Sequence, residues 1–197
     1  MICSFISELA YEIRLTSDPS CEQQIVKGSQ MLTGSGIRWA PVEHQDNRTS
    51  SIEEAQLIAE QYDSLISQNW INEKGLERPL EQKDVLVVAP YNAQVSLLAQ
   101  HLPDNAEVGT VDKFQGREGA VVLVSMTASS AADVPRGMNF LYDLHRLNVA
   151  VSRARALAVI VGSPTLLQVE CRTAEQMRLA NALCRFVEQC GSTHRTS

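Results

Sequence analysis

The sequence has few residues of the kinds that bind metals, and those residues are not clustered. Five cysteines are spread over 197 residues without a C-x-x-C pair, and the four histidines are scattered as well. Structural zinc sites need four such ligands at short spacings, so we expect no metal site. An odd number of cysteines and the lack of a signal peptide fit a reducing compartment, and we therefore expect a cytoplasmic protein.

The sequence also lacks an excess of positive charge and any long hydrophobic run. The formal net charge is −6 and the sequence pI is about 5.2. A chain of this charge has no overall basic field that attracts nucleic acid, so any contact with phosphate must be local. No apolar run approaches the roughly 20 residues that span a bilayer, so we expect no membrane partner.

The sequence does contain the aliphatic material for the core of one domain, with 44% hydrophobic residues. Short aliphatic runs at 85–89, 120–126 and 156–161 are typical of buried strands, and amphipathic stretches separate them. This pattern predicts an α/β fold with a mostly parallel sheet flanked by helices, whose ligands bind beyond the carboxyl ends of the strands. We assign residues 1–190 to this domain and residues 191–197 to a disordered tail.

Local signals predict where helices begin. The sequences S-I-E-E at 51–54 and T-A-E-Q at 173–176 are capping boxes, each followed by an amphipathic pattern. Asn92 is expected to cap a helix after the strand at 85–89, and apolar spacing predicts another helix over 2–13. Polar, glycine-containing stretches are predicted to be loops: residues 16–36, 69–83 and 127–139.

One stretch, residues 146–155, is expected to be a helix that holds an arginine off its packed face. At roughly 100° per residue, Leu147 and Val151 share one face, while Arg146 and Arg153 share another. Arg155 points almost opposite to Arg153, so the two should differ in role. Arg153 is thus a candidate phosphate-sensing residue; the simpler reading is a solvated helix charge.

Two other places are candidates for contact with phosphate. The strand at 85–89 leads directly into a helix whose first turn exposes unpaired N–H groups, although this arrangement occurs in any α/β protein. The turn at 112–119 carries Asp, Lys, Gln, Arg and Glu between two core strands, whereas a short loop normally needs only turn-forming residues. This composition favours a functional turn.

Three segments, taken in order, resemble motifs IV, V and VI of superfamily 1 helicases. They read V-V-A-P-Y-N-A-Q at 87–94, G-T-V-D-K-F-Q-G-R-E at 109–118 and R-L-N-V-A-V-S-R-A-R at 146–155. The likeness is to the nonsense-mediated-decay and nuclease-helicase branch. Through P-R-G-M-N-F-L-Y at 135–142 and E-C-R-T-A-E-Q-M-R-L-A-N at 170–181 it extends to bacterial proteins in which a RecB-like nuclease precedes the helicase.

The resemblance implies a second, C-terminal RecA-like domain with a three-layer α/β/α fold, of the P-loop NTPase type but without its own P-loop. In that family Arg153 resembles the motif VI arginine that reaches the γ-phosphate of ATP, as a catalytic residue. The residues implied on the nucleotide side are Gly116, Glu118, Arg146 and Arg153. The residues implied on the single-strand side are Tyr91, Asn92, Gln94, Thr110, Asp112 and Lys113.

The chain also departs from a complete motor. It has no G-x-x-x-x-G-K-[ST] and no D-E pair on a strand, and His145 stands where many relatives carry a further arginine. The family's other arginine-bearing segment would end about where Met1 begins. The resemblance therefore implies a partner, the first RecA-like domain of a longer chain, with ATP and Mg²⁺ bound there and none bound by this fragment alone. The expected substrate is single-stranded nucleic acid, DNA in preference to RNA.

Two other functions remain open on the sequence. A non-catalytic RecA-like binding or scaffold module would carry the same fold and would need a complementary partner surface. A nuclease or small hydrolase is suggested by the charged turn at 112–118, but no second carboxylate cluster or His-based triad accompanies it.

Overall fold

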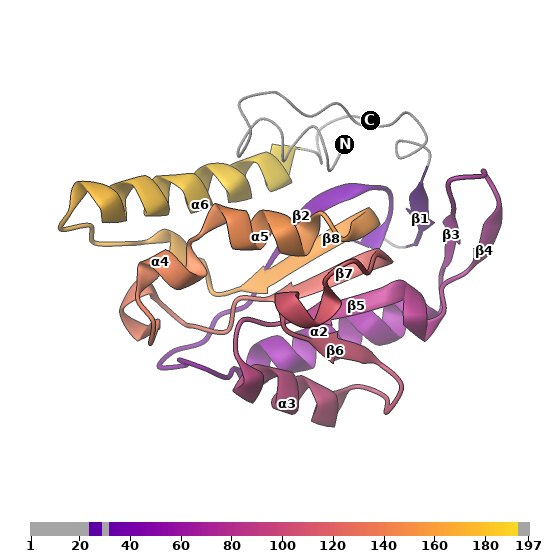
Figure 1. The fold of residues 1–197 in the computed structure, drawn as a ribbon, viewed down its shortest axis with the longest axis horizontal. Helices are drawn as coiled ribbons and strands as arrows, with labels where there is room; N and C mark the ends of the chain where they lie inside the picture. Colours follow the sequence, from indigo (N-terminus) through magenta and orange to yellow (C-terminus); the bar gives the residue numbers. More distant parts are fainter. Residues whose placement is uncertain (1–23, 29–31, 193–197) are drawn as a thin grey trace.

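The computed structural model describes residues 24–28 and 32–192. The helix expected over 2–13 and residues 193–197 of the expected tail lie outside this part of the chain. Five parallel strands form the central sheet, in the order β2-β8-β7-β5-β6 (Figure 1). They are β2 (Gly36–Pro41), β5 (Val85–Val88), β6 (Glu107–Gly109), β7 (Gly119–Ser125) and β8 (Ala154–Gly162).

Helices cover both faces of this sheet (Figure 1). One layer contains α2 (Ile52–Ile66) and α3 (Asn92–His101), and the other contains α4 (Met138–Leu141), α5 (Leu144–Val151) and α6 (Ala174–Ser192). Three layers of this kind, around an all-parallel sheet, confirm the RecA-like α/β/α fold.

The central strands are aliphatic throughout because both of their faces are buried. Along β5, Val85 and Val87 pack in the core on the side of α2 and α3. Leu86 and Val88 pack in the other core, with α5 and α6. A strand side chain alternates between faces with a period of two, so a strand between two helix layers needs an apolar residue at every position.

A second, smaller sheet occupies two stretches that the sequence predicts to be loops. Its antiparallel strands are β1 (Ile25–Lys27), β3 (Asn69–Ile71) and β4 (Glu77–Pro79), in the order β1-β3-β4. Gly75 allows the turn between β3 and β4 with a φ of 73°. The loop prediction was wrong there because each strand is only three residues long, which is too short to show alternation.

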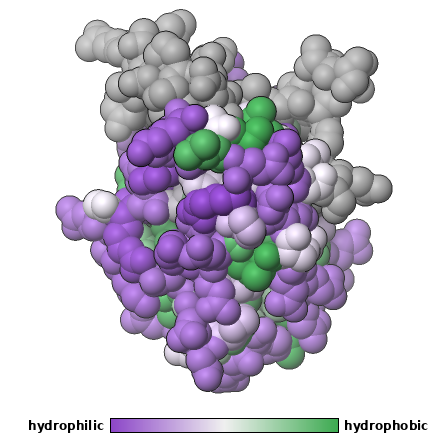
Figure 2. All heavy atoms as spheres, turned by 90° about the vertical axis from the view of Figure 1, so that its right-hand side faces the viewer, coloured by the Kyte–Doolittle hydropathy of each residue, from purple (hydrophilic) through white to green (hydrophobic). Residues whose placement is uncertain are grey.

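The side of the molecule that carries β3 and β4 is mainly hydrophilic. Figure 2 shows this face with only separate hydrophobic groups among polar ones. Leu76, in the β3–β4 turn, is 61% exposed. Scattered apolar residues of this kind are normal on a surface and do not form an extended contact patch.

The helix termini confirm some of the capping predictions and correct others. Thr173 and Gln176 form the reciprocal capping box, with each side chain accepting from the other's backbone N–H. Asn92 is the first residue of α3 rather than its cap, and the N-cap, Tyr91, makes no side-chain hydrogen bond. At α2 the Ser51 Oγ accepts from the Glu54 N–H at 3.2 Å, but Glu54 does not reach back.

Two further expectations need correction. The loop predicted at 127–139 contains a short 3-10 turn, η5 (Ala131–Asp133), and the start of α4. The helix predicted over 146–155 ends at Val151, and β8 begins at Ala154. Within the described residues, no helix is both long and apolar enough to cross a membrane.

An ion pair fastens the small sheet to the main domain. Arg78 of β4 donates from both terminal nitrogens to Asp84, each at 2.7 Å, and its guanidinium lies 5.1 Å from the Trp70 ring centroid. Asp84 ends the 3-10 turn η3 (Gln82–Asp84), immediately before β5. Burial alone would raise the pKa of Asp84, but hydrogen bonds from Arg78 and from the Glu81 N–H hold the pKa below its usual value.

We expect the substitution Asp84→Asn to destabilise the fold by about 1–3 kcal/mol at pH 7, because the guanidinium loses its charged partner. A carboxyl whose pKa is lower in the folded state stabilises fully above its unfolded pKa, about 3.9, and loses that contribution as pH falls toward the folded value. The difference in free energy of unfolding between the unchanged protein and the Asp84→Asn variant should therefore decrease as pH falls from about 5 to about 3. Urea unfolding across this range measures it, and a constant difference would contradict the assignment.

Candidate functional site

Helix α5 carries Arg146 at its beginning, and Arg153 follows its end. Arg146 lies in its first turn and Arg153 lies two residues beyond its last residue, so roughly 10 Å separates them along the axis at 1.5 Å per residue. Leu147 and Val151 of this helix are buried and pack in the core. The sequence placed both arginines on one helix face, but the early end of α5 moves Arg153 into the turn before β8.

The guanidinium of Arg153 is half-buried and has a single weak contact. Its Nη2 donates to the Val111 carbonyl at 3.3 Å, while its Nε is buried without a hydrogen-bond partner. The Arg153 carbonyl accepts from the Gly119 N–H at 3.0 Å, which fixes the backbone beside the start of β7. Within the described residues Arg153 has no ion pair, so its remaining donors are available to an anion.

The neighbouring Glu118 and Arg155 form an exposed ion pair. The Arg155 Nε donates to the Glu118 Oε2 at 3.0 Å, and more than two fifths of each side chain is exposed. Gly116 adopts a φ of 75° in this turn, and a Cβ placed there would meet nothing within 4 Å. Three predicted nucleotide-side residues, Gly116, Glu118 and Arg153, thus lie on the turn and strand starts around Gly119. Arg146 lies apart from them.

Three residues predicted to contact the strand lie around the 3-10 turn η4 (Val111–Phe114). Thr110 is the N-cap residue of this turn, and Asp112 is exposed. The Lys113 Nζ donates to the Val108 carbonyl at 2.7 Å, which bends this side chain back over the end of β6. Asp112 is therefore the freest of the three in this conformation.

The three predicted strand-contacting residues of the 91–94 segment divide between surface and core. Asn92 is exposed in the first turn of α3. Gln94 is completely buried, with its amide bonded to the backbone N–H and carbonyl of Ser51 at 2.7 and 3.1 Å. Tyr91 is 7% exposed, and its hydroxyl is buried without a partner. Gln94 therefore joins α3 to α2, and its predicted role as a strand ligand stays a prediction.

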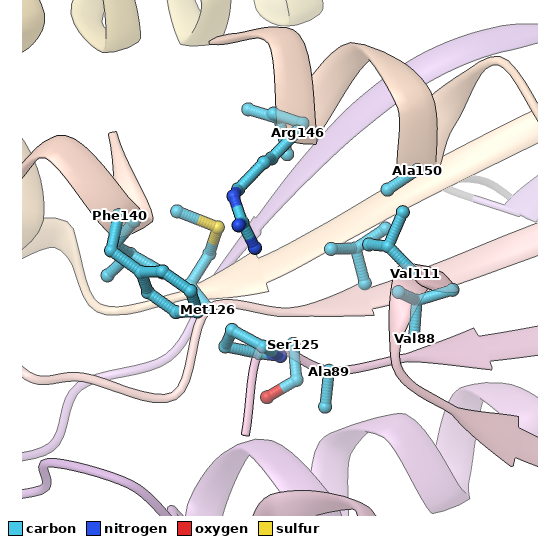
Figure 3. Close-up of a pocket in the computed structure, with 12 residues that line it drawn as sticks. Val88, Ala89, Val111, Ser125, Met126, Phe140, Arg146 and Ala150 are labelled. Atoms are coloured by element: carbon cyan, nitrogen blue, oxygen red, sulfur yellow. The ribbon is translucent and has the colours of Figure 1, made fainter. Parts of the chain in front are cut away.

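A cavity of about 50 Å³ opens at the carboxyl ends of β5 and β7 (Figure 3). Ligand pockets usually have several hundred Å³, so this cavity cannot enclose a nucleotide. Its lining is largely apolar and comes from the two strand ends, η4, α4 and α5. The lining residues are Val88, Ala89, Pro90, Val111, Val124, Ser125, Met126, Phe140, Leu141, Arg146, Leu147 and Ala150.

Two arginines converge on one aromatic ring at the mouth of this cavity. The guanidinium carbons of Arg136 and Arg146 lie 4.8 and 4.6 Å from the Phe140 ring centroid, and the Tyr91 ring lies 5.3 Å from it. Figure 3 shows Arg146 reaching down from α5 toward the side of the cavity where Phe140 lies. Burial raises the pKa of Tyr91, and the positive charge of Arg136 opposes that rise. Arg136 and Phe140 lie in the segment 135–142 that resembles helicases, but the sequence predicts no role for either residue.

A buried carboxylate fixes the backbone behind the cavity. Glu54 of α2 is 0% exposed, and it accepts from the Ser125 hydroxyl at 2.5 Å and from the Thr127 N–H at 2.8 and 2.9 Å. Thr127 has a φ of 73°, a costly conformation for a β-branched residue. Because Ser125 lines the cavity and Thr127 follows two residues later, Glu54 holds this part of the cavity wall in place.

His44 completes this network. Its Nε2 lies 3.0 Å from Glu54, and its Nδ1 lies 2.7 Å from the Ser129 Oγ. With the proton on Nε2, His44 donates to Glu54 and accepts from Ser129, so each polar group of the ring is satisfied. The sequence reading missed this cluster because Glu54 fits a capping box and nothing local indicates a partner more than 70 positions away.

No group of three or more His, Cys, Asp or Glu side chains within residues 24–28 and 32–192 is arranged to hold a metal ion. The polar and aromatic groups around Arg153 and around the cavity beside Phe140 are instead guanidinium, amide and aromatic side chains. Guanidinium groups at a surface turn or on an aromatic ring bind phosphate rather than catalyse by acid–base chemistry, since arginine does not lose its proton in proteins.

Comparison with known proteins agrees with this chemistry. A family model described as an AAA domain, AAA_12, matches residues 1–165. Over 138 residues the chain is 32% identical to the DNA replication ATP-dependent helicase/nuclease JHS1 of Arabidopsis thaliana, covering 66% of this chain and 10% of that protein.

Two further relatives carry helicase names. The DNA polymerase alpha-associated DNA helicase A of Schizosaccharomyces pombe is 44% identical over 90 residues, which cover 44% of this chain and 13% of that protein. The helicase mov-10-B.2 of Danio rerio is 35% identical over 112 residues, which cover 49% of this chain and 11% of that protein.

The matched regions span only about a tenth of the length of these relatives. The family model, in contrast, covers most of this chain, and the parallel sheet with its two helix layers is the fold expected of that family. The chain belongs to the AAA domain family AAA_12, has a RecA-like fold and is similar to segments of proteins named as helicases.

Proposed function

We propose that this chain is the second motor domain of an ATP-dependent superfamily 1 helicase of the nonsense-mediated-decay and nuclease-helicase type. In this proposal Arg153 is the residue that reaches the phosphates of ATP held by a first RecA-like domain. The proposal includes single-stranded nucleic acid as the substrate, DNA in preference to RNA, and a likeness to bacterial proteins that also carry a RecB-like nuclease.

The observation that carries the proposal is the state of the Arg153 side chain. It lies in a turn, has a buried Nε without a partner, and makes one 3.3 Å bond to a carbonyl. A buried guanidinium nitrogen without an acceptor is unfavourable, and an incoming phosphate oxygen would remove that cost. The site therefore fits an anion.

ATP with Mg²⁺, held by the first domain, would supply the transferable phosphoryl group. From this chain, Arg153 would bind and stabilise the negative charge on the phosphate oxygens, from a position fixed by the Gly119 N–H. The exposed carboxylate of Glu118, held by Arg155, would accept hydrogen bonds from the sugar hydroxyls of the same nucleotide. The sequence has no P-loop, so in this proposal the first motor domain holds the phosphates.

The proposal is tested by ATP turnover with and without a first motor domain. The chain alone should show no turnover above background, with or without single-stranded DNA. A polypeptide that joins it to a P-loop-bearing first motor domain should hydrolyse ATP, with stimulation by single-stranded DNA. Turnover by the chain alone would contradict its role as one half of a motor, and no turnover by the joined protein would leave the scaffold function as the better explanation.

A further inference from the structure

The Arg136–Phe140–Arg146 cluster has the charge arrangement of a site for an anion. Its two guanidinium carbons lie 4.8 and 4.6 Å from the same ring centroid, so the two positive charges are within about 10 Å, one Debye length at 0.1 M salt. Their repulsion is therefore only partly screened. Within residues 24–28 and 32–192, neither arginine has an ion pair, in a chain whose net charge is −6.

The ring holds both arginines in place without neutralising them. A guanidinium over an aromatic face is attracted by the ring and keeps its N–H groups free at its rim. The ring itself packs against Tyr91, whose buried hydroxyl has no partner and feels the charge of Arg136. The cluster thus presents two oriented sets of donors beside an unpartnered hydroxyl.

The position of the cluster favours a nucleic-acid strand over ATP as the source of phosphate. Arg146 and Arg153 lie toward opposite ends of α5, and the cavity beside Phe140 is too small to enclose a nucleotide. Exposed Asn92, at the start of α3, follows Tyr91 directly and extends the polar surface along the carboxyl ends of the strands. A strand can continue across such an open edge, whereas a mononucleotide needs an enclosing pocket.

We propose that Arg136 and Arg146, both held on Phe140, bind neighbouring phosphates of a single nucleic-acid strand that crosses the carboxyl ends of β5 and β7. This inference rests on the proposed function and moves Arg146 from the nucleotide side to the strand side. Phe140 is a positioning residue in this site, because its ring faces are used by the two guanidinium groups.

The test measures binding of a fluorescein-labelled oligothymidine of about 15 nucleotides to this chain by anisotropy, over a series of salt concentrations. The double variant R136Q/R146Q should bind about tenfold or more weakly at 50 mM salt. Its slope of log K against log salt should fall by about 1.4, since each lost phosphate contact on a single strand removes about 0.7. The variant F140L, which changes no charge, should bind about threefold or more weakly.

A matched control removes two positive charges elsewhere. In K74Q/R185Q, one residue lies in the β3–β4 turn and the other is exposed on α6. The affinity of this control should stay within about twofold of the unchanged chain, and thermal unfolding of every variant verifies the fold. An equal loss of affinity in both double variants overturns the proposal, because the effect then comes from net charge and not from this site. The absence of binding by the unchanged chain overturns it as well.

The two sources of phosphate are separated in the joined two-domain protein. R136Q/R146Q should raise the oligothymidine concentration that gives half-maximal ATP turnover, with maximal turnover retained within about twofold. Loss of turnover even at saturating oligothymidine would make Arg146 a nucleotide ligand and overturn the strand site, while the proposed motor function would stand. Failure of the motor function appears instead as no turnover by the unchanged joined protein, whatever the binding result.

Discussion

Replacing Arg153 with alanine is expected to lower ATP turnover of the joined two-domain protein by about a thousandfold or more, with oligonucleotide affinity unchanged within about twofold. An arginine that reaches the transferring phosphoryl group from another domain is worth about 10³–10⁵ in rate in comparable NTPases. The loss should fall on turnover because this positive charge acts on negative charge in the transition state.

The Arg153→Ala substitution removes few contacts within this domain. Arg153 has only the 3.3 Å bond to the Val111 carbonyl to lose, and it has no ion pair in the part of the chain that the structure describes. Stability should therefore change little. Arg153→Lys should also lose most of the activity, since a point charge on a different stem does not reproduce the planar fork of donors.

Arg155→Ala is the matched control for Arg153. It removes the same type of side chain two residues away, and its present partner is the exposed carboxylate of Glu118. We expect turnover within about tenfold of the unchanged protein. If turnover of the Arg153→Ala protein also stays within tenfold, about 1.4 kcal/mol on the barrier, the assignment of Arg153 is wrong.

The largest expected effect on stability comes from Glu54. Its substitution by alanine should cost about 3–5 kcal/mol in the free energy of unfolding, because it leaves the Ser125 hydroxyl, the Thr127 N–H and His44 buried without their acceptor. The left-handed backbone of Thr127 then also loses the interaction that holds it. Urea unfolding followed by circular dichroism measures the change.

Two other variants keep this prediction testable if the alanine protein does not fold. Glu54→Gln keeps the side-chain volume but turns one acceptor oxygen into a donor that faces other donors, so it should still cost about 2 kcal/mol or more. Glu60→Gln, on the exposed side of the same helix, should change stability by no more than about 0.5 kcal/mol. Equal effects at positions 54 and 60 would show that the network contributes nothing.

The layers of the fold followed from the sequence because the relevant signals are local. The aliphatic runs of β5, β7 and β8 and the capping residues Ser51 and Thr173 each report their own surroundings within a few residues. Period and composition are enough to indicate a two-sided sheet. The helical spacing of residues 146–155 made Arg153 a candidate for phosphate contact, and the resemblance to helicase motifs then implied a specific role for it.

The parts that were missed depend on contacts between distant segments. Glu54 meets Ser125 and Thr127 only after α2 has packed on β7, and no pattern near Glu54 predicts that partner. The separation of Arg146 from Arg153 depends on where α5 ends, and helix ends are poorly determined by propensity. The convergence of Arg136 and Arg146 on one ring likewise needs α4 and α5 to be placed side by side.

The strand order also determines when the sheet can be completed. Among the described residues, β2 lies at one edge of the sheet and pairs with β8 alone, and the register joins Gly36 to Leu157. During synthesis, β2 must therefore wait for β8, which follows β5, β6 and β7 in the chain, before it gains a hydrogen-bonded neighbour in this sheet. Closing so long a loop costs chain entropy before any contact rewards it, which slows folding. Until β8 has emerged, β2 exposes its backbone donors and acceptors, and the unfinished chain is at its most prone to pairing with other molecules.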